Sequence, residues 1–363
     1  MPSKQNDNKH NHNPPATLRD VANLAGVSIK TVSRVVNNQN EISEATRKRV
    51  QAAISQLDYR PNILAQSLIR QRSKTLGVIA WGIDYYGPSR TVVGIEQEAN
   101  ELGYSLFLCM VAHPTDDHEQ ILNTLISRRV EGIIWAIPEV AGNRDWIQKN
   151  HLDYFPPVVF LTMQGRPGTA SVSIDNRNGA RQAVQHLIQQ GKRKIGIITG
   201  PLAWWEASER YLGWQQTLEE AGLDASPSLV FKSDDWSAVN GERGMHTLLE
   251  NEPEIDAVFA SNDQIALGAL GIAHKLGRRV PQDLAIVGFD NTPEAAFFWP
   301  SLTTINQQLI DVGRLAVKNL HEIIEARRLQ KEPAEPSTTI MRPELIIRAS
   351  SWNNTSLPSH YSE

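Results

Sequence analysis

Short apolar runs alternate with amphipathic segments along most of the chain, and this alternation is the feature that most limits its fold. Residues 76–80 (Leu-Gly-Val-Ile-Ala) are apolar at every position, as expected for a strand that is buried on both faces. Further strands are expected at residues 104–110, 132–136, 194–199, 228–232, 257–260 and 284–289, with helices at 91–102, 118–127, 208–220, 240–249 and 265–276. This order predicts an α/β protein whose parallel sheets carry helices on both faces, in two doubly wound subdomains with a cleft between them.

A dehydrogenase is an alternative interpretation of the same alternation. The sequence contains no Gly-x-Gly-x-x-Gly, no Gly-x-x-x-x-Gly-Lys-Ser/Thr and no Gly-x-Ser-x-Gly motif. Its acidic residues also lack the paired spacing that is typical of catalysis. We therefore do not expect the chain to be an enzyme, and we expect no cofactor.

The N-terminal part of the chain, before the alternation begins, predicts three short helices. Thr17 can cap the first helix, Gly26 ends it, and Ser28 begins the second, which runs to about Val36. Ser43 can cap the third. Two short helices joined by a glycine-containing turn and followed by a third are typical of a helix-turn-helix unit, whose second helix enters the major groove of DNA.

The second helix presents a polar stripe. Lys30, Ser33, Arg34 and Asn37 are spaced i, i+3, i+4, i+7, which places them on one face. Arg34 can reach a guanine or a phosphate, and Lys30 and Asn37 carry donors and acceptors that match base edges. The apolar stripe expected to face the core from the first helix consists of Val21, Leu24 and Ala25.

Charge is distributed unevenly along the chain. The whole sequence has a formal net charge of −4, but residues 16–75 carry ten Lys or Arg and only four Asp or Glu, so this segment is +6 and the remainder is −10. Such asymmetry is typical of a polyanion-binding head on an acidic body. A solvated helical surface is the alternative explanation of the charge alone.

The segment from Thr17 to Asn37 (Thr-Leu-Arg-Asp-Val-Ala-Asn-Leu-Ala-Gly-Val-Ser-Ile-Lys-Thr-Val-Ser-Arg-Val-Val-Asn) resembles the DNA-binding head of the lactose repressor and galactose repressor (LacI/GalR) family, as does the segment from Leu57 to Leu68. The similarity extends from about residue 16 to about residue 350 and implies a periplasmic-binding-protein-like body. The DNA-binding residues that it implies are Thr17, Ser28, Ile29, Lys30, Thr31, Ser33, Arg34 and Asn37 of the head, and Asn62, Ala65 and Leu68 of a hinge helix.

The resemblance also implies a role for the end of the hinge helix. The residue at the position of Leu68 enters the minor groove as an apolar wedge, which bends the duplex so that both heads reach it. An ordinary core leucine is the alternative. Ile29 and Lys30 stand where the family reads bases and differ from the pair in lactose repressors, so the operator sequence stays open.

Polar side chains follow the expected strands of the second half. Arg210, Trp236, Asn262 and Asp290 each come after one of these strands, and ligands of open α/β sheets bind beyond the carboxyl ends of strands. Carboxylate and guanidinium groups can each hold two neighbouring hydroxyls, and a tryptophan packs on the C–H face of a sugar ring. The set suits a neutral polyol better than a phosphate.

Each of these residues also has a purely structural interpretation. Asn262 could cap the next helix, and Asp290 could end its strand in an Asx-turn. Arg210 could pair with Glu206 or Glu209 of its own helix, and the tryptophan could belong to the core.

The family resemblance implies that a small sugar or glycoside is the effector. It assigns the hydroxyl contacts to Arg210, Asn262 and Asp290, ring stacking to Trp236 and closure of the site to Gln307. Together with two tyrosines that follow the first strand, the candidate effector-binding residues are Tyr85, Tyr86, Asn178, Arg210, Trp236, Asn262, Asp290 and Gln307. Asn178 and Ala136 stand where lactose repressors have an acid and a polar residue, so the identity of the sugar stays open.

The implied function is that of a repressor that binds a palindromic operator, a double-stranded DNA site, as a homodimer. The C-terminal tail has no leucine heptads, so no tetramerising zipper is expected. The expected divisions are a disordered arm (1–15), a DNA-binding domain (16–61), a hinge helix and linker (62–75), an N-subdomain (76–163 and 305–330), a C-subdomain (164–304 and 331–350) and a polar tail (351–363).

The remaining features predict a cytoplasmic protein without a bound metal. Residues 1–15 contain no apolar stretch and so do not form a secretory signal, and no run of about 18 apolar residues could span a membrane. The single cysteine, Cys109, makes neither an intrachain disulfide nor a cysteine-based zinc site. A solute-binding protein has the same two-lobed body but needs an export signal, and a sugar-modifying enzyme is the third alternative.

Overall fold

The computed structural model describes residues 16–37, 42–60, 72–116, 118–148, 155–330 and 336–352. The chain divides into two compact units, Met1–Ser73 and Lys74–Glu363, and we call them the head and the body. Each unit has a hydrophobic core of its own.

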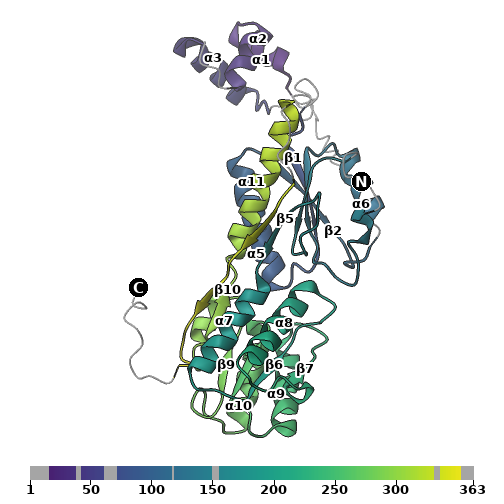
Figure 1. Cartoon of the computed structure of the whole chain (residues 1–363). Helices are drawn as coiled ribbons and strands as arrows, with labels where there is room; N and C mark the ends of the chain where they lie inside the picture. Colours follow the sequence, from purple (N-terminus) through teal and green to yellow (C-terminus); the bar gives the residue numbers. More distant parts are fainter. Residues whose placement is uncertain are drawn as a thin grey trace, which may run out of the picture. The chain divides into compact units, whose positions relative to one another are not determined.

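The head contains the three expected helices, α1 (Leu18–Ala25), α2 (Ile29–Val36) and α3 (Glu44–Gln56) (Figure 1). The expected capping of α1 is complete, because Thr17 Oγ1 accepts the Asp20 N–H at 3.4 Å while the Asp20 carboxylate accepts the Thr17 N–H at 2.8 Å. The interaction with Thr17 also lowers the pKa of Asp20. A polar cap thus fixes the start of the first helix.

The core of the head differs from the expected stripe at one position. Gly26 ends α1 in the left-handed region at φ 63°, as expected, and Val21 and Ala25 are buried. Leu24, however, is 46 % exposed, and Ala22 is buried in its place, because the face of α1 that meets the other helices is the one through Val21, Ala22 and Ala25. The other helices contribute Val32, Val35, Val50 and Ala53 to this core.

The first half of the body is built on a sheet of six parallel strands in the order β11-β5-β4-β3-β1-β2 (Figure 1). The strands are β1 (Thr75–Ala80), β2 (Ser105–Met110), β3 (Gly132–Ala136), β4 (Val158–Leu161), β5 (Ala170–Ile174) and β11 (Thr338–Met341). Helices α5 (Tyr86–Glu101) and α11 (Leu309–Arg328) cover one face, where Ile95 and Val312 pack with Leu76. Helix α6 (His118–Ser127) covers the other face through Leu122.

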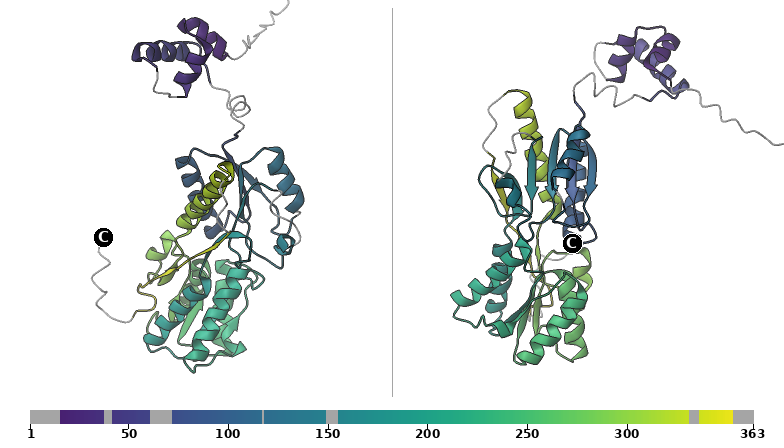
Figure 2. Two further views of the ribbon diagram at one scale, coloured as in Figure 1. Left: turned by 45° about the horizontal axis from the view of Figure 1, so that its top comes forward. Right: turned by 90° about the vertical axis from the view of Figure 1, so that its right-hand side faces the viewer.

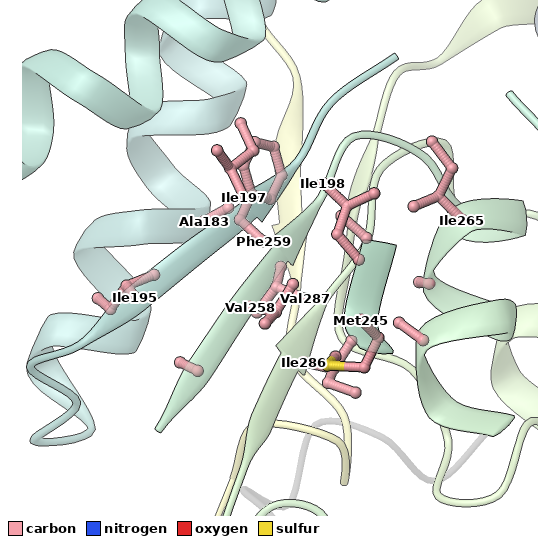
Figure 3. Packing of buried hydrophobic residues seen from close by; sticks show 14 of the residues in the cluster. Ala183, Ile195, Ile197, Ile198, Met245, Val258, Phe259, Ile265, Ile286 and Val287 are labelled. Atoms are coloured by element: carbon pink, nitrogen blue, oxygen red, sulfur yellow. The ribbon is translucent and has the colours of Figure 1, made fainter. Parts of the chain in front are cut away.

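The second half has four parallel strands in the order β7-β6-β8-β9. Its elements are β6 (Ile195–Ile198), β7 (Val230–Phe231), β8 (Ala257–Ala260), β9 (Ala285–Val287), α7 (Asn176–Gln189), α8 (Trp205–Glu220), α9 (Ala238–Asn251) and α10 (Asp263–Lys275), with a short η3 (Pro227–Leu229). In Figure 3, Ile197 and Phe259 lie on the same side of this sheet as Ala183 of α7. Met245 of α9 lies beside Ile286. Helices therefore pack on both faces of this sheet too, as the alternation predicted.

The chain passes three times between the two halves of the body (Figure 2). The crossings run from β5 to α7, from β10 (Thr304–Asn306) to α11, and from β11 to β12 (Glu344–Ile346). Strands β10 and β12 pair with each other in an antiparallel ladder at the crossings. Three short connections hold the halves together at one side, which is the geometry of a two-lobed body that can open and close.

The expected subdomain boundaries are wrong at two places. Strands β5 and β11 fall within the segments assigned to the second subdomain, 164–304 and 331–350, but both belong to the six-stranded sheet. The serines of β5 interrupt its apolar run, so the strand gave no clear signal. Its serine side chains are instead buried and hydrogen-bonded: Ser173 Oγ donates to the Met163 carbonyl at 2.8 Å.

Two helices begin three or more residues earlier than expected. Helix α5 begins at Tyr86 and contains Pro88 in its first turn, where the missing N–H of a proline is harmless. Helix α8 begins at Trp205, three residues before the expected start at Ser208. The residues before these starts, Tyr85 and Trp204, are thereby brought to the carboxyl ends of β1 and β6.

Helices α5 and α11 approach each other closely through glycine. A Cβ placed at Gly94 would lie 2.0 Å from the carbonyl oxygen of Ile310, and one at Gly313 would lie 2.2 Å from that of Thr91. Because the colliding atoms belong to the backbone, rotation of a side chain cannot relieve the overlap.

We expect Gly94→Ala to lower the free energy of unfolding by about 1–3 kcal/mol, the usual cost of overpacking a core. Urea unfolding of the body followed by circular dichroism measures the change. Glu96→Ala, at an exposed position of the same helix, is the control and should change the free energy by less than about 0.5 kcal/mol. Equal effects of the two substitutions would contradict the close helix contact.

Candidate functional site

The exposed start of α2 is the first candidate surface. Ser28 caps the helix by accepting the Thr31 N–H at 3.1 Å, and its hydroxyl lies 2.9 Å from that of Thr31. Ile29 is 43 % exposed although it is apolar, and Lys30 is exposed beside it. The first turn of α2 therefore presents an apolar contact, a cation and hydroxyl groups together.

The rest of the polar stripe continues along α2. Ser33, Arg34 and Asn37 are half-buried, and the Asn37 amide donates to the Ser33 carbonyl at 2.7 Å, which holds this side chain against the helix end. Thr17 is exposed at the start of α1. The expected hinge-helix contacts, Asn62, Ala65 and Leu68, lie outside the described residues.

The second candidate is a cavity of about 400 Å³ between the two halves of the body. It lies at the carboxyl ends of strands from both sheets, where the rule for open α/β sheets places a ligand. Seven of the eight candidate effector-binding residues line it: Tyr85, Tyr86, Arg210, Trp236, Asn262, Asp290 and Gln307.

The eighth candidate, Asn178, does not line the cavity, and its contact with the effector stays a prediction. It lies in the first turn of α7. Its N–H donates to Asp175, the cap of α7, and its side-chain oxygen accepts a hydrogen bond from Gln182 at 2.8 Å. Asn176, two residues earlier, points toward the site instead.

Arg210 is the electrostatic centre of the cavity. Its Nε donates to Asn176 Oδ1 at 2.8 Å, its Nη1 donates to the Ser261 carbonyl at 2.5 Å, and its guanidinium lies 3.8 Å from the centre of the Phe289 ring. Asp290 Oδ1 is 4.0 Å from Arg210 Nη1. The expected alternative, a pair with Glu209, is not formed, because Glu209 bonds Arg177.

Asp290 is held in an unusual conformation. Its φ is 127°, which side-chain-bearing residues rarely adopt, and its N–H donates to the Ile305 carbonyl at 2.8 Å. Gln307 Nε2 donates to its carboxylate. Burial raises the pKa of Asp290 to about 7, and Arg210 only partly opposes this rise. Backbone strain and a costly buried carboxyl at one position are typical of a binding site.

Asn262 caps a helix, as one of its two interpretations expected, and also lines the cavity. Its Oδ1 caps α10 by accepting the Ile265 N–H at 2.8 Å, and its Nδ2 donates to the Trp236 carbonyl at 3.1 Å. Asn262 thereby fixes the loop that carries Trp236. The side chain of the following Asp263 is buried, accepts from Thr304 Oγ1 at 2.5 Å and has a pKa raised to about 6 by burial.

Aromatic rings form one wall of the cavity. Trp204 stands edge-on to Trp236 at 5.7 Å and to Tyr85 at 6.2 Å, and Trp81 lies 5.2 Å from Trp204. Gly200 makes room for this wall, because a Cβ there would lie 2.3 Å from the Trp236 ring. Trp236 is part of the core and also lines the cavity, and its stacking on a sugar ring stays a prediction.

Several residues of the site were not among the candidates from the sequence, and three of them stand out. Trp204 and Glu206 line the cavity, and Asn176 bonds Arg210 beneath it. Trp204 and Glu206 follow β6, so a stricter use of the strand-end rule would have found them. Asn176 gave no such signal, because it follows β5, a strand that the sequence did not reveal.

The arrangement offers hydrogen-bond acceptors and aromatic faces rather than a reaction centre. Within the described ranges, no group of three or more His, Cys, Asp or Glu side chains could hold a metal ion. Across the same residues, no helix combines the length and apolar character needed to cross a bilayer.

Comparisons with known proteins agree with this division of the chain. Residues 17–62 match the model of bacterial regulatory proteins of the lacI family, and residues 184–351 match the periplasmic binding protein-like domain. The two matches fall on the head and on the body, as the resemblance implied.

Solved structures of about 30 % sequence identity share the fold. The lac repressor dimer bound to operator and the anti-inducer ONPF is 30 % identical, covers 94 % of this chain and all of its own, and superposes with a TM-score of 0.83. A complex of the transcriptional regulator CelR with cellobiose is also 30 % identical, covers 92 % of this chain and 99 % of its own, and has a TM-score of 0.67.

Characterised relatives match over nearly the whole length. The HTH-type transcriptional repressor PurR of Actinobacillus pleuropneumoniae serotype 3 is 34 % identical over 338 residues, which are 93 % of this chain and 99 % of the relative. PurR of Haemophilus influenzae (strain PittEE) is 34 % identical over 337 residues, 92 % of this chain and 98 % of its own. With a helix-turn-helix head and a two-lobed body that both match, the chain belongs to the lacI family of bacterial regulatory proteins.

Proposed function

We propose that the chain is a homodimeric transcriptional repressor whose binding to a palindromic operator is controlled by a small sugar or glycoside. The observation that carries the proposal is the cavity, in which Arg210, Asp290 and the Trp236 wall meet between two lobes. Related proteins support each part, since the lac repressor structure is a dimer on operator DNA and the CelR structure holds cellobiose.

The chemistry of the cavity suits a sugar. Asp290 and Asn262 offer oxygen atoms to hydroxyl groups, and the tryptophan wall offers an apolar surface to a ring face. The volume of about 400 Å³ lies within the range of about 300–1,000 Å³ typical of small-molecule sites.

A ligand can control operator binding because the cavity lies between the two lobes. A ligand that contacts Tyr86 of one lobe and Asp290 of the other stabilises one arrangement of the lobes over another. If operator affinity depends on the same equilibrium, sugar and operator change each other's affinity by the same factor. A repressor of this kind acts on chromosomal DNA, so we place the chain in the cytoplasm.

Exposed apolar side chains support the dimer. Phe297, at the end of η4 (Pro293–Phe297), is 87 % exposed and Trp299 is 92 % exposed. Leu108 and Met110, each 44 % exposed, lie on β2, the edge strand of the six-stranded sheet. Bulky apolar groups in such positions are typical of contact surfaces between chains, and an uncovered sheet edge also favours pairing.

The proposal is tested by selecting operators from a pool of palindromic duplexes and measuring binding by fluorescence anisotropy at fixed salt. Arg34→Ala should weaken binding to the selected operator by about 1–3 kcal/mol, the usual value of one base contact. Arg193→Ala, which removes an exposed cation from the body, is the control for net charge. If the Arg34 variant bound the operator with undiminished affinity, Arg34 would not contact the DNA.

Asp290→Asn should abolish the response of operator binding to the sugar while leaving binding without sugar intact. The substitution keeps the volume of the side chain but removes the charge-assisted bonds that a carboxylate makes to hydroxyl groups. Anisotropy with and without sugar measures the response, and Asp145→Asn, at an exposed position outside the cavity, is the control. A normal response in the Asp290 variant would place the effector elsewhere.

Trp299→Glu combined with Phe297→Glu should shift the protein from dimer toward monomer, because four carboxylates would face one another across a two-fold contact. Sedimentation velocity over a concentration series measures the shift. Leu276→Glu, at another exposed apolar position of the body (53 % exposed), is the control. A dimer of unchanged affinity in the double variant would exclude this face from the interface.

A further inference from the structure

Glu206 is a carboxyl group that the site described so far does not use. It lies in the first turn of α8, lines the cavity and is 8 % exposed. Its Oε2 is buried and has no hydrogen-bond partner. Arg210, one turn further along α8, gives its Nε and Nη1 bonds to Asn176 and Ser261.

Burial of the Glu206 carboxyl group costs free energy. Burial raises the pKa of Glu206 to about 7. The positive charges of Arg210 and of Arg144, which belongs to the other lobe, lower this pKa, and the negative charge of Glu139 raises it. A buried acceptor without a partner destabilises the protein, because it has lost its hydrogen bonds to water. A ligand hydroxyl that donates to Oε2 would remove this cost, so a partner from the cavity itself is favoured.

The other charged groups of the cavity limit what that ligand can be. Four carboxyl side chains line it, from Asp84, Glu206, Asp290 and Glu294, and Arg210 is the only cation among the described lining residues. The donors of Gln307 and Asn262 are already bound to Asp290 and to the Trp236 carbonyl. The charged side chains of the cavity are therefore mainly acidic, and these carboxylates attract hydroxyl groups and repel phosphate and carboxylate groups.

We propose that Glu206 is an effector-binding residue that accepts a hydrogen bond from a sugar hydroxyl, and that the acidic lining restricts the effector to sugars without phosphate or carboxylate groups. The inference rests on the proposed function and adds to it the chemical class of the effector. It also assigns the Glu206 side chain to recognition rather than to the fold.

The ligand class is tested by calorimetric titration of the full-length protein with matched sugars. Glucose and cellobiose represent uncharged sugars, and each is compared with its 6-phosphate and with the corresponding uronate, within a wider panel of uncharged mono- and disaccharides. We expect binding only among the uncharged sugars. Tight binding of a phosphorylated or acidic sugar would overturn the inference but keep the proposed function, whereas the absence of binding by any sugar would overturn both.

The role of Glu206 is tested with the sugar that binds best. Glu206→Ala should weaken its binding at least tenfold, and Glu206→Gln, which keeps an acceptor oxygen but loses the charge, should weaken it less. Glu219→Ala and Glu219→Gln, at an exposed position near the other end of α8, are the matched controls and should stay within twofold of the wild type. Unchanged affinity in Glu206→Ala would overturn the assignment.

A second measurement separates recognition from a structural role. A carboxyl whose pKa is raised in the folded state destabilises that state once it ionises, so the penalty is small at pH 5 and full above about pH 7. Without sugar, Glu206→Gln should therefore raise the melting temperature more at pH 8 than at pH 5, while it weakens sugar binding. A lower melting temperature at pH 8 would show that the carboxylate supports the fold and would overturn the proposal.

Discussion

The buried guanidinium of Arg210 is the interaction on which the rest of the body depends. It binds Asn176 at the start of α7, the Ser261 carbonyl after β8 and, more loosely, Asp290 after β9. Burial lowers the pKa of Arg210, and the nearby carboxyl groups oppose this change, so the cation is stable only while these partners surround it. Removing one member of a buried charged pair typically costs about 3–5 kcal/mol, and a single side chain thus fixes three strand ends around one cavity.

The parallel sheets explain why those strand ends meet. In both halves the strands run parallel, so their carboxyl ends and the following helix starts lie at one edge of each sheet. Helices α5, α8 and α10 begin there, and Tyr85, Trp204 and Asn262 stand immediately before their first residues. Of these three residues, only Asn262 caps its helix with its side chain. The side chains of Tyr85 and Trp204 form part of the cavity wall instead.

The sequence was most informative where local chemistry decides structure. Capping residues and apolar runs predicted the helices of the head and the strands β1, β3 and β8. Strand ends and the family resemblance together gave eight candidate effector-binding residues, seven of which line the cavity. The sequence failed where distant contacts decide. Three of the five residues of strand β5 are serine or alanine, and the strand is recognisable only from its pairing with β4 and β11. The resemblance pointed to Asn178, whereas Asn176 is the residue that bonds Arg210.

The crossings between the two lobes of the body also contribute residues to the cavity. Gln307, which bonds Asp290, lies on the crossing between β10 and α11, and Leu309 at the start of α11 also lines the cavity. A ligand that competes for Asp290 therefore acts on the connection about which the lobes would turn. In the other direction, Glu294 of η4 lines the cavity while Phe297 at the end of η4 is exposed on the surface. The four residues from Glu294 to Phe297 thus connect the cavity lining with the face proposed for the second subunit.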